Sequence, residues 1–93
     1  MGYYVLLYTV VDNFIDRRAP FRSAHLQLVD DAQRRGHLVM AGALGDPPDG
    51  ALLVFQAAER SAVEDFARHD PYVLNGVVTG WEVRPWHVVT SAQ

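Results

Sequence analysis

Residues 3–11 read YYVLLYTVV, a run of aromatic and β-branched side chains with almost no polar interruption. Side chains of these types favour β-structure. A strand with one face in water alternates between apolar and polar residues, and this run does not alternate. We therefore predict a strand that is covered on both faces, by helices on one side and by another layer on the other.

Downstream of this strand the spacing of the apolar residues changes. Phe21, Leu28 and Ala32 recur at helical intervals among polar residues. Gly36 follows two arginines, and this combination is typical of a helix end. A helix is predicted over residues 21–35.

Two further apolar runs are short and close together, at residues 37–44 (HLVMAGAL) and 51–57 (ALLVFQA). The intervening residues 45–50 (GDPPDG) contain two prolines, which cannot continue a strand ladder. We predict an antiparallel hairpin from these segments.

The rest of the chain supplies a second helix and a last strand. Ser61, with Glu64 three residues later, predicts a capping box at the start of the helix. The helix is expected to end at Asp70, because the residue before a proline is disfavoured in helical conformation. A short turn over residues 71–76 then leads to a strand over residues 77–89.

The resulting order, βαββαβ, predicts a single α+β domain of the ferredoxin-like type over residues 1–93. Right-handed crossovers place both helices on one face of a four-stranded antiparallel sheet. The other sheet face has no cover within one copy, although 49% of the residues are hydrophobic. A second copy packed on this open face would cover it, so a homodimer is expected.

Composition narrows the classes of function. The net charge is −3 and the basic residues are scattered, which argues against a nucleic-acid partner. The chain has no cysteine, so no disulfide or cysteine metal site is expected. No apolar run approaches the roughly 18 residues of a membrane span, and the first residues do not resemble a signal peptide. A cytoplasmic protein without a membrane partner is expected.

One local cluster of basic residues precedes the first helix. It consists of Arg17, Arg18 and Arg22. A solvated surface and a rim that attracts anions to a pocket are both consistent with this cluster.

Two polar residues lie at positions that the helical spacing reserves for apolar ones. His25 lies four residues after Phe21 and three before Leu28 on the apolar stripe of the first helix. Asp70 continues the stripe of Val63, Phe66 and Ala67 at the end of the second. Since both helices are expected on one sheet face, these two side chains could meet.

A pair of this kind would have a chemical use. A buried carboxylate is costly unless it is hydrogen-bonded, and an imidazole would supply that bond. The carboxylate would fix the imidazole tautomer and leave the other ring nitrogen free for proton transfer. The alternative is that His25 and Asp70 are ordinary structural residues, a helix histidine and a helix stop. His37, His69 and His87 have no comparable partner, and no spacing of residues indicates a metal site.

Several segments together resemble the YCII (YciI-like) family, over nearly the whole chain and in the expected order. They are Arg22-Ser23-Ala24-His25-Leu26, Gly36-His37-Leu38, Ala41-Gly42-Ala43-Leu44, Asp49-Gly50-Ala51, Asp70-Pro71-Tyr72 and Val83-Arg84-Pro85-Trp86. The resemblance implies a dimeric ferredoxin-like α+β barrel with a His–Asp pair, here His25 and Asp70, as its active site. It also implies that at least one branch is a dehydrochlorinase of a chlorinated hydroxyquinol, which needs no cofactor.

We therefore expect a cofactor-independent enzyme in which His25 is the general base or acid and Asp70 orients it. A lyase, dehydrochlorinase or isomerase reaction on a small polar substrate, aromatic in character, fits this pair. Arg22 and Ser23 are expected to bind an anionic or hydroxyl group of the substrate, and Tyr72 to line the wall of the pocket.

Two other readings stay open. One is a non-catalytic dimer that binds a small ligand or a partner in the same pocket. The other is an interaction domain in which His25 and Asp70 form a purely structural pair.

Overall fold

The computed structural model describes residues 2–92 as four strands and four α-helices, with one 3-10 helix. In chain order they are β1 (Gly2–Val10), α1 (Phe14–Arg18), the 3-10 helix η1 (Ala19–Phe21), α2 (Arg22–Arg34), β2 (Leu38–Leu44), β3 (Gly50–Ala57), α3 (Arg60–His69), α4 (Pro71–Leu74) and β4 (Val78–Trp86). Over this part of the chain, no helix has both the length and the apolarity that a membrane crossing requires.

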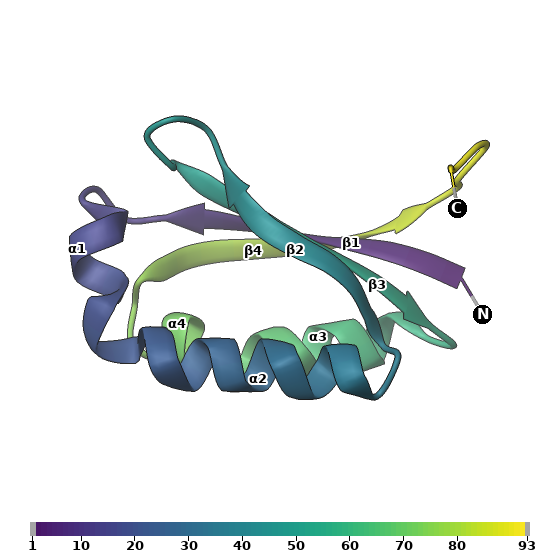
Figure 1. Ribbon diagram of the computed structural model, residues 1–93, viewed down its shortest axis with the longest axis horizontal. Coiled ribbons are helices and arrows are strands. Elements are labelled where there is room, and N and C mark those ends of the chain that lie inside the picture. Colours follow the sequence, from purple (N-terminus) through teal and green to yellow (C-terminus); the bar gives the residue numbers. More distant parts are fainter. Residues whose placement is uncertain (1, 93) are drawn as a thin grey trace.

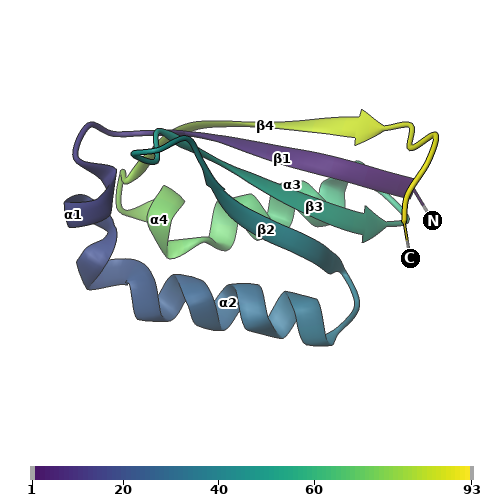
Figure 2. The same cartoon turned by 45° about the horizontal axis from the view of Figure 1, so that its top comes forward.

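The four strands form one antiparallel sheet in the order β2-β3-β1-β4. The two long helices, α2 and α3, lie side by side against one face of this sheet, while the opposite face carries no helix (Figure 1, Figure 2). The predicted ferredoxin-like α+β fold is confirmed. Pro85 lies on β4, an edge strand, where a residue without an N–H is tolerated.

The strand register separates the two faces of the sheet. Leu6 of β1 pairs with Leu53 of β3 and with Val83 of β4, and all three side chains are buried under the helices. Tyr8 points to this same face, because alternate residues of a strand share a side. The core of the protein therefore lies between the sheet and the pair α2 and α3.

The opposite side, which we call the open sheet face, is only partly covered within one copy. It carries alternate residues of three strands: Val5 and Leu7 of β1, Leu52 and Val54 of β3, and Met40 and Leu44 of β2. The side chains of Val5, Leu7 and Leu52 are half-buried, and Met40 is 64% exposed. Within one copy only the helix side of β1 is closed, as expected, and the predicted second layer on the open sheet face stays a prediction.

Two short helices appear, one in residues 12–20, where no helix or strand was predicted, and one in residues 71–76, where a turn was predicted. Residues 12–20 contain α1, which follows Asn13 in the left-handed conformation and is anchored by the buried ring of Phe14. Residues 71–74 form α4. Neither helix is long enough to display a 3.6-residue period, so pattern analysis does not detect them.

The ends of the long helices follow prediction only in part. Gly36, with a φ of 79°, ends α2 as expected, and the N–H of His37 bonds the carbonyl of Ala32. The predicted capping box is wrong, because α3 begins at Arg60. Ser61 is therefore already inside the helix, and its hydroxyl bonds backwards to Glu59 at 3.2 Å. The last strand ends at Trp86, three residues short of Val89.

Candidate functional site

Asp70 lies at the junction of α3 and α4, where its side chain is completely buried. The following proline forces its backbone out of the helical region, to a φ of −68° and a ψ of 124°. One carboxylate oxygen, Oδ1, then accepts the N–H of Tyr72 at 2.9 Å and caps α4. The chain thus places a carboxylate in the core at a fixed point between two helices.

His25 reaches this carboxylate from α2. Its Nδ1 lies 2.8 Å from Oδ1 and 3.0 Å from Oδ2 of Asp70, and 13% of its side chain is exposed. His25 and Asp70, which the apolar stripes of their helices predicted to lie close together, are therefore in contact. Because a carboxylate accepts hydrogen bonds, Nδ1 carries the hydrogen, and Nε2 is the ring nitrogen left for other chemistry.

A third residue, Tyr8, completes the set of donors around Asp70. Its hydroxyl donates to Oδ2 at 2.7 Å from the central strand β1. Burial raises the pKa of Tyr8 above its ordinary value, and the negative charge of Asp70 and the hydrogen bond to it act in the same direction. The phenol therefore stays protonated and remains a donor. Sequence reasoning missed Tyr8, because within an unbroken apolar run it reads as one more core residue.

A second contact holds the imidazole of His25, on one face of its ring. It stacks on the ring of Tyr72, with centroids 3.8 Å apart and the planes 9° from parallel. One face of His25 is thereby covered by an aromatic ring, while its Nδ1 is bonded to Asp70. Rotation of the imidazole is restricted by both contacts, as a group that exchanges protons at a fixed point requires.

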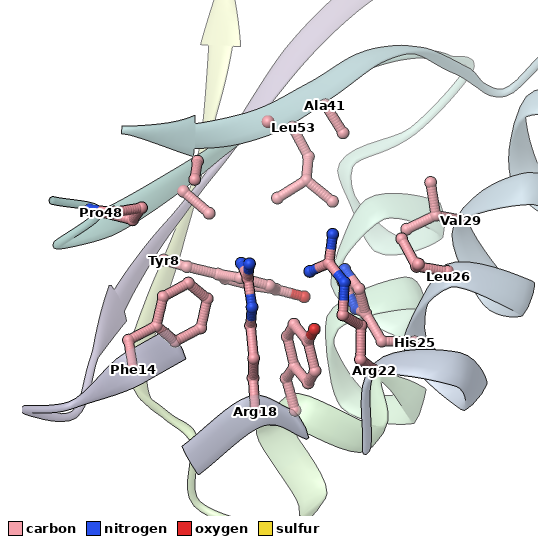
Figure 3. A pocket seen from close by; sticks show the side chains of 14 residues that line it. Tyr8, Phe14, Arg18, Arg22, His25, Leu26, Val29, Ala41, Pro48 and Leu53 are labelled. Atoms are coloured by element: carbon pink, nitrogen blue, oxygen red, sulfur yellow. The ribbon is translucent and has the colours of Figure 1, made fainter. Parts of the chain in front are cut away.

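A cavity of about 290 Å³ opens beside this group (Figure 3). Its wall is mostly apolar, and the polar side chains come from β1, α4 and the segment from α1 to α2. The residues that line it are Tyr8, Phe14, Arg18, Arg22, His25, Leu26, Val29, Ala41, Gly42, Ala43, Pro48, Ala51, Leu53 and Tyr72. Its volume is at the lower end of the range for small-molecule pockets.

Of the three predicted substrate-binding residues, two line the cavity and one does not. Arg22 and Tyr72 line the cavity together with His25. Ser23 is exposed and is not among the lining residues, so the geometry gives no support to a role for it in binding. Ser23 follows Arg22 directly, and neighbouring residues on a helix face different directions.

The basic cluster is divided by the structure. Arg18 and Arg22 extend into the cavity (Figure 3), whereas Arg17 is not a lining residue; Arg18 is half-buried, and both Arg17 and Arg22 are exposed. Arg18 was considered only as part of a rim that attracts anions to a pocket, one of two interpretations of the basic cluster, and was not among the predicted substrate-binding residues. The guanidinium of Arg18 lies 5.0 Å from the ring centroid of Phe14.

Within residues 2–92, no three histidine or carboxylate side chains are grouped so that they could hold a metal ion. The side chains at the site comprise an oriented imidazole, a buried carboxylate, two phenols and two guanidinium groups.

The fold and this site define a small ferredoxin-like α+β protein with a His–Asp pair beside a ligand-sized cavity. The sequence profile of the YCII-related domain matches residues 1–87, and the chain belongs to this family. It is 30% identical over 96 residues to an uncharacterized protein of Haemophilus influenzae, covering 94% of this chain and 98% of that protein.

Two solved structures share the fold. The 5-chloro-2-hydroxyhydroquinone dehydrochlorinase TftG of Burkholderia phenoliruptrix, in complex with 2,5-dihydroxybenzoquinone, aligns with a TM-score of 0.76. That alignment covers 91% of this chain and 93% of the other, at 17% identity. An antibiotic biosynthesis monooxygenase aligns with a TM-score of 0.57 at 13% identity, over 97% of this chain and 100% of the other.

Proposed function

We propose that this protein is a cofactor-independent enzyme that uses His25 and Asp70 for general acid–base chemistry on a small polar ring compound. The observation that carries the proposal is the hydrogen bond from Nδ1 of His25 to the buried carboxylate of Asp70 at the wall of the cavity. A histidine held in this way exchanges protons through a single atom, Nε2. The reaction belongs to the lyase, dehydrochlorinase or isomerase type.

The roles follow from the contacts. Nε2 of His25 removes a proton from the substrate, and Asp70 orients the ring and stabilises the imidazolium that forms. Tyr8 and the N–H of Tyr72 hold the carboxylate in place. General acid–base catalysis of this type contributes about 10²- to 10⁴-fold, which is enough for an activated substrate.

A dehydrochlorination can be written with these groups alone. The chlorinated ring first tautomerises, so that the proton of one hydroxyl moves to the carbon that carries chlorine. His25 then takes the proton of a second hydroxyl, the oxygen of that hydroxyl becomes a carbonyl, and the adjacent C=C bond shifts to the carbon that carries chlorine. The carbon–chlorine bond breaks, chloride leaves, and the imidazolium returns its proton to water, so the net change is loss of HCl. An isomerisation begins with the same proton transfer and returns the proton to a different carbon.

The structural similarity to the dehydrochlorinase supports this choice of reaction type. The name of that protein states that it acts on a chlorinated hydroxyquinol. A hydroxylated ring of this size fits a cavity of about 290 Å³. The stacked pair of Tyr72 and His25 provides a planar wall beside which such a ring can lie.

The proposal is tested with two compounds, 1,2,4-trihydroxybenzene and 5-chloro-2-hydroxyhydroquinone. In D₂O, NMR follows enzyme-dependent exchange of ring hydrogens in the first, and chloride release is measured for the second. His25→Asn is expected to lower both rates by about 10²- to 10⁴-fold, because the proton acceptor is gone. Asp70→Asn keeps the shape of the side chain and is expected to lower the same rates.

His69→Asn is the matched control, since His69 also lies at the end of a helix but is exposed and bonds only the carbonyl of Asp65 among the described residues. It should retain the wild-type rates. Wild-type rates in a folded His25→Asn variant would show that the mechanism is wrong. Binding of these rings without exchange or chloride release would favour the non-catalytic binding module.

We also propose that the protein is a homodimer formed through the open sheet face. The support is the composition of that face, where Met40 and Leu44 are exposed next to the half-buried Val5, Leu7 and Leu52. A second copy of the same surface would remove these apolar side chains from water, and two-fold packing of identical patches is the commonest way to do so.

A further inference from the structure

The lining of the cavity has an electrostatic character opposite to that of the whole chain. The chain carries a formal charge of −3, yet the lining residues include two arginines and no aspartate or glutamate. Asp70 is buried behind His25 and Tyr8, both hydrogen-bonded to it, and does not itself line the cavity. A cavity of this composition favours an anion.

The two arginines are available for such an anion. Among the described residues, neither Arg18 nor Arg22 has a carboxylate within 4.0 Å, whereas Arg34, Arg35 and Arg68 each have at least one. Arg18 is half-buried and lies over the ring of Phe14, so its guanidinium is held at the cavity. A planar guanidinium binds a carboxylate through two parallel hydrogen bonds, which no neutral group reproduces.

An independent observation indicates a second polar contact. The hydroxyl of Tyr72 is buried and has no hydrogen-bond partner within residues 2–92, although Tyr72 lines the cavity. A buried hydroxyl without a partner is unfavourable and uncommon in folded proteins. A ligand oxygen that reaches the stacked pair of His25 and Tyr72 would give this hydroxyl its missing partner.

Apolar side chains fill the space between these polar groups. Phe14 lies at one end of the cavity, and Leu26, Val29 and Leu53 lie across from it (Figure 3). Such walls exclude water and accept the faces and edges of a ring. Figure 3 shows Arg18 and Arg22 between these apolar walls, with Arg22 beside His25, so the charged and polar groups of the cavity face the same space.

We propose that the cavity binds a single-ring carboxylate, with its carboxylate on Arg18 and Arg22 and a ring hydroxyl or carbonyl oxygen at His25 and Tyr72. This inference rests on the proposed function for the location of the reacting group, and it adds the class of substrate. It makes Arg18 and Arg22 residues that determine specificity. Tyr72 becomes a hydrogen-bond donor to the substrate as well as a wall of the pocket.

The test is equilibrium binding by isothermal titration calorimetry with three probes of nearly equal size. They are 4-hydroxybenzoate, its neutral analogue 4-hydroxybenzamide, and benzoate, which lacks the hydroxyl. 4-Hydroxybenzoate is expected to bind about tenfold more tightly than either of the others, since each lacks one of the two polar contacts. Arg18→Gln and Arg22→Gln should each remove most of the preference for carboxylate over amide.

Tyr72→Phe keeps the ring that stacks on His25 and should reduce the preference for 4-hydroxybenzoate over benzoate, because only the His25 contact to the ring oxygen remains. Arg17→Gln removes the same charge one residue from Arg18 but outside the cavity, so it should keep both preferences. Equal affinity for the acid and the amide, or no binding of any probe, would overturn the inference. An equal effect of Arg17→Gln and Arg18→Gln would also overturn it, because only the general charge would then matter.

These outcomes are separate from those of the catalytic proposal. His25→Asn is expected to keep the preference for carboxylate over amide, since the arginines are unchanged. Selective binding without any proton exchange or halide release would leave this inference standing and reject the enzyme. Turnover of neutral rings, together with no preference for carboxylates, would support the enzyme and reject this inference.

Discussion

Tyr8 illustrates how one side chain serves both the core and the site. Its ring is buried on the helix side of the sheet, and its hydroxyl donates to Asp70 at 2.7 Å. Its pKa is raised above the ordinary 10.0 by burial first and by Asp70 second. The unfolded chain therefore loses the phenol proton near pH 10 while the folded protein retains it.

The consequence is a loss of stability at high pH. Above pH 10 the unfolded state binds fewer protons than the folded state, so the free energy of unfolding falls by roughly 1.4 kcal/mol per pH unit through this residue. Tyr8→Phe lacks the group, and its stability should not show this part of the decline. The other tyrosines are common to both proteins and cancel.

Urea unfolding of both proteins between pH 8 and pH 12 measures the difference. Tyr8→Phe is expected to be less stable by about 1–3 kcal/mol at pH 8, because Asp70 loses a donor. The advantage of the wild type should then shrink as the pH rises above 10. A difference that stays constant over this range would show that Tyr8 ionises alike in both states.

Among individual residues, the sequence predicted only part of the candidate site. His25 and Asp70 could be found because each interrupts an apolar helix stripe, and a polar residue at such a position needs a partner. Tyr8 gave no such signal, since a tyrosine in a strand fits the core by its ring alone. Arg22 was found and Ser23 was selected with it, although adjacent helix residues do not share a face.

The β2–β3 hairpin is the element that closes the cavity opposite the helices, through Ala41, Ala43 and Pro48. Its turn depends on Gly45, which has a φ of 89°. A Cβ on this residue would lie 2.6 Å from Oδ1 of Asp49 and 3.1 Å from the carbonyl oxygen of Pro47. A side chain here is therefore opposed both by the backbone conformation and by its neighbours.

Gly45→Ala is expected to lower the free energy of unfolding by about 2–4 kcal/mol. Gly36→Ala is the matched control, because Gly36 has a φ of 79° but no heavy atom within 4 Å of the added Cβ. It should cost about 1–2 kcal/mol, the cost of the left-handed conformation alone. Urea unfolding measures both, and equal losses would mean that the contacts in the turn are of no importance.

The elements also show where periodicity fails. The hairpin and the two long helices were predicted near their observed bounds, because each spans enough residues to display its period. Helix α1 has five residues, and the burial of Phe14 rather than a repeated pattern holds it. Because α1 carries Arg18 and was not predicted, the sequence did not reveal this part of the cavity wall.

For the whole molecule, the order of elements was sufficient to predict the fold. Alternation of strand and helix periods gave βαββαβ, and the handedness of crossovers placed both helices on one side. The lack of alternation in residues 3–11 predicted cover on both faces, which a single copy does not provide. The structure shows what remains uncovered, and the homodimer is our proposal for what covers it.

Met40 offers a direct test of this proposal. It is 64% exposed on the open sheet face, so a substitution there leaves the core of one copy unchanged. Met40→Glu would place a charge against the apolar surface of the second copy, and a charge buried without a partner is costly. We expect the dimer to dissociate at least 100-fold more readily, measured by sedimentation equilibrium at micromolar protein concentrations.

Leu74→Glu is the matched control, because Leu74 is 68% exposed but lies on α4, away from the open sheet face. It makes the same change from an exposed apolar side chain to a carboxylate, and it should leave the association unchanged. A monomeric wild-type protein would refute the dimer outright. A Met40→Glu variant that stays dimeric while Leu74→Glu dissociates would place the contact on the helical side, and the half-buried Val5, Leu7 and Leu52 would then remain partly in water.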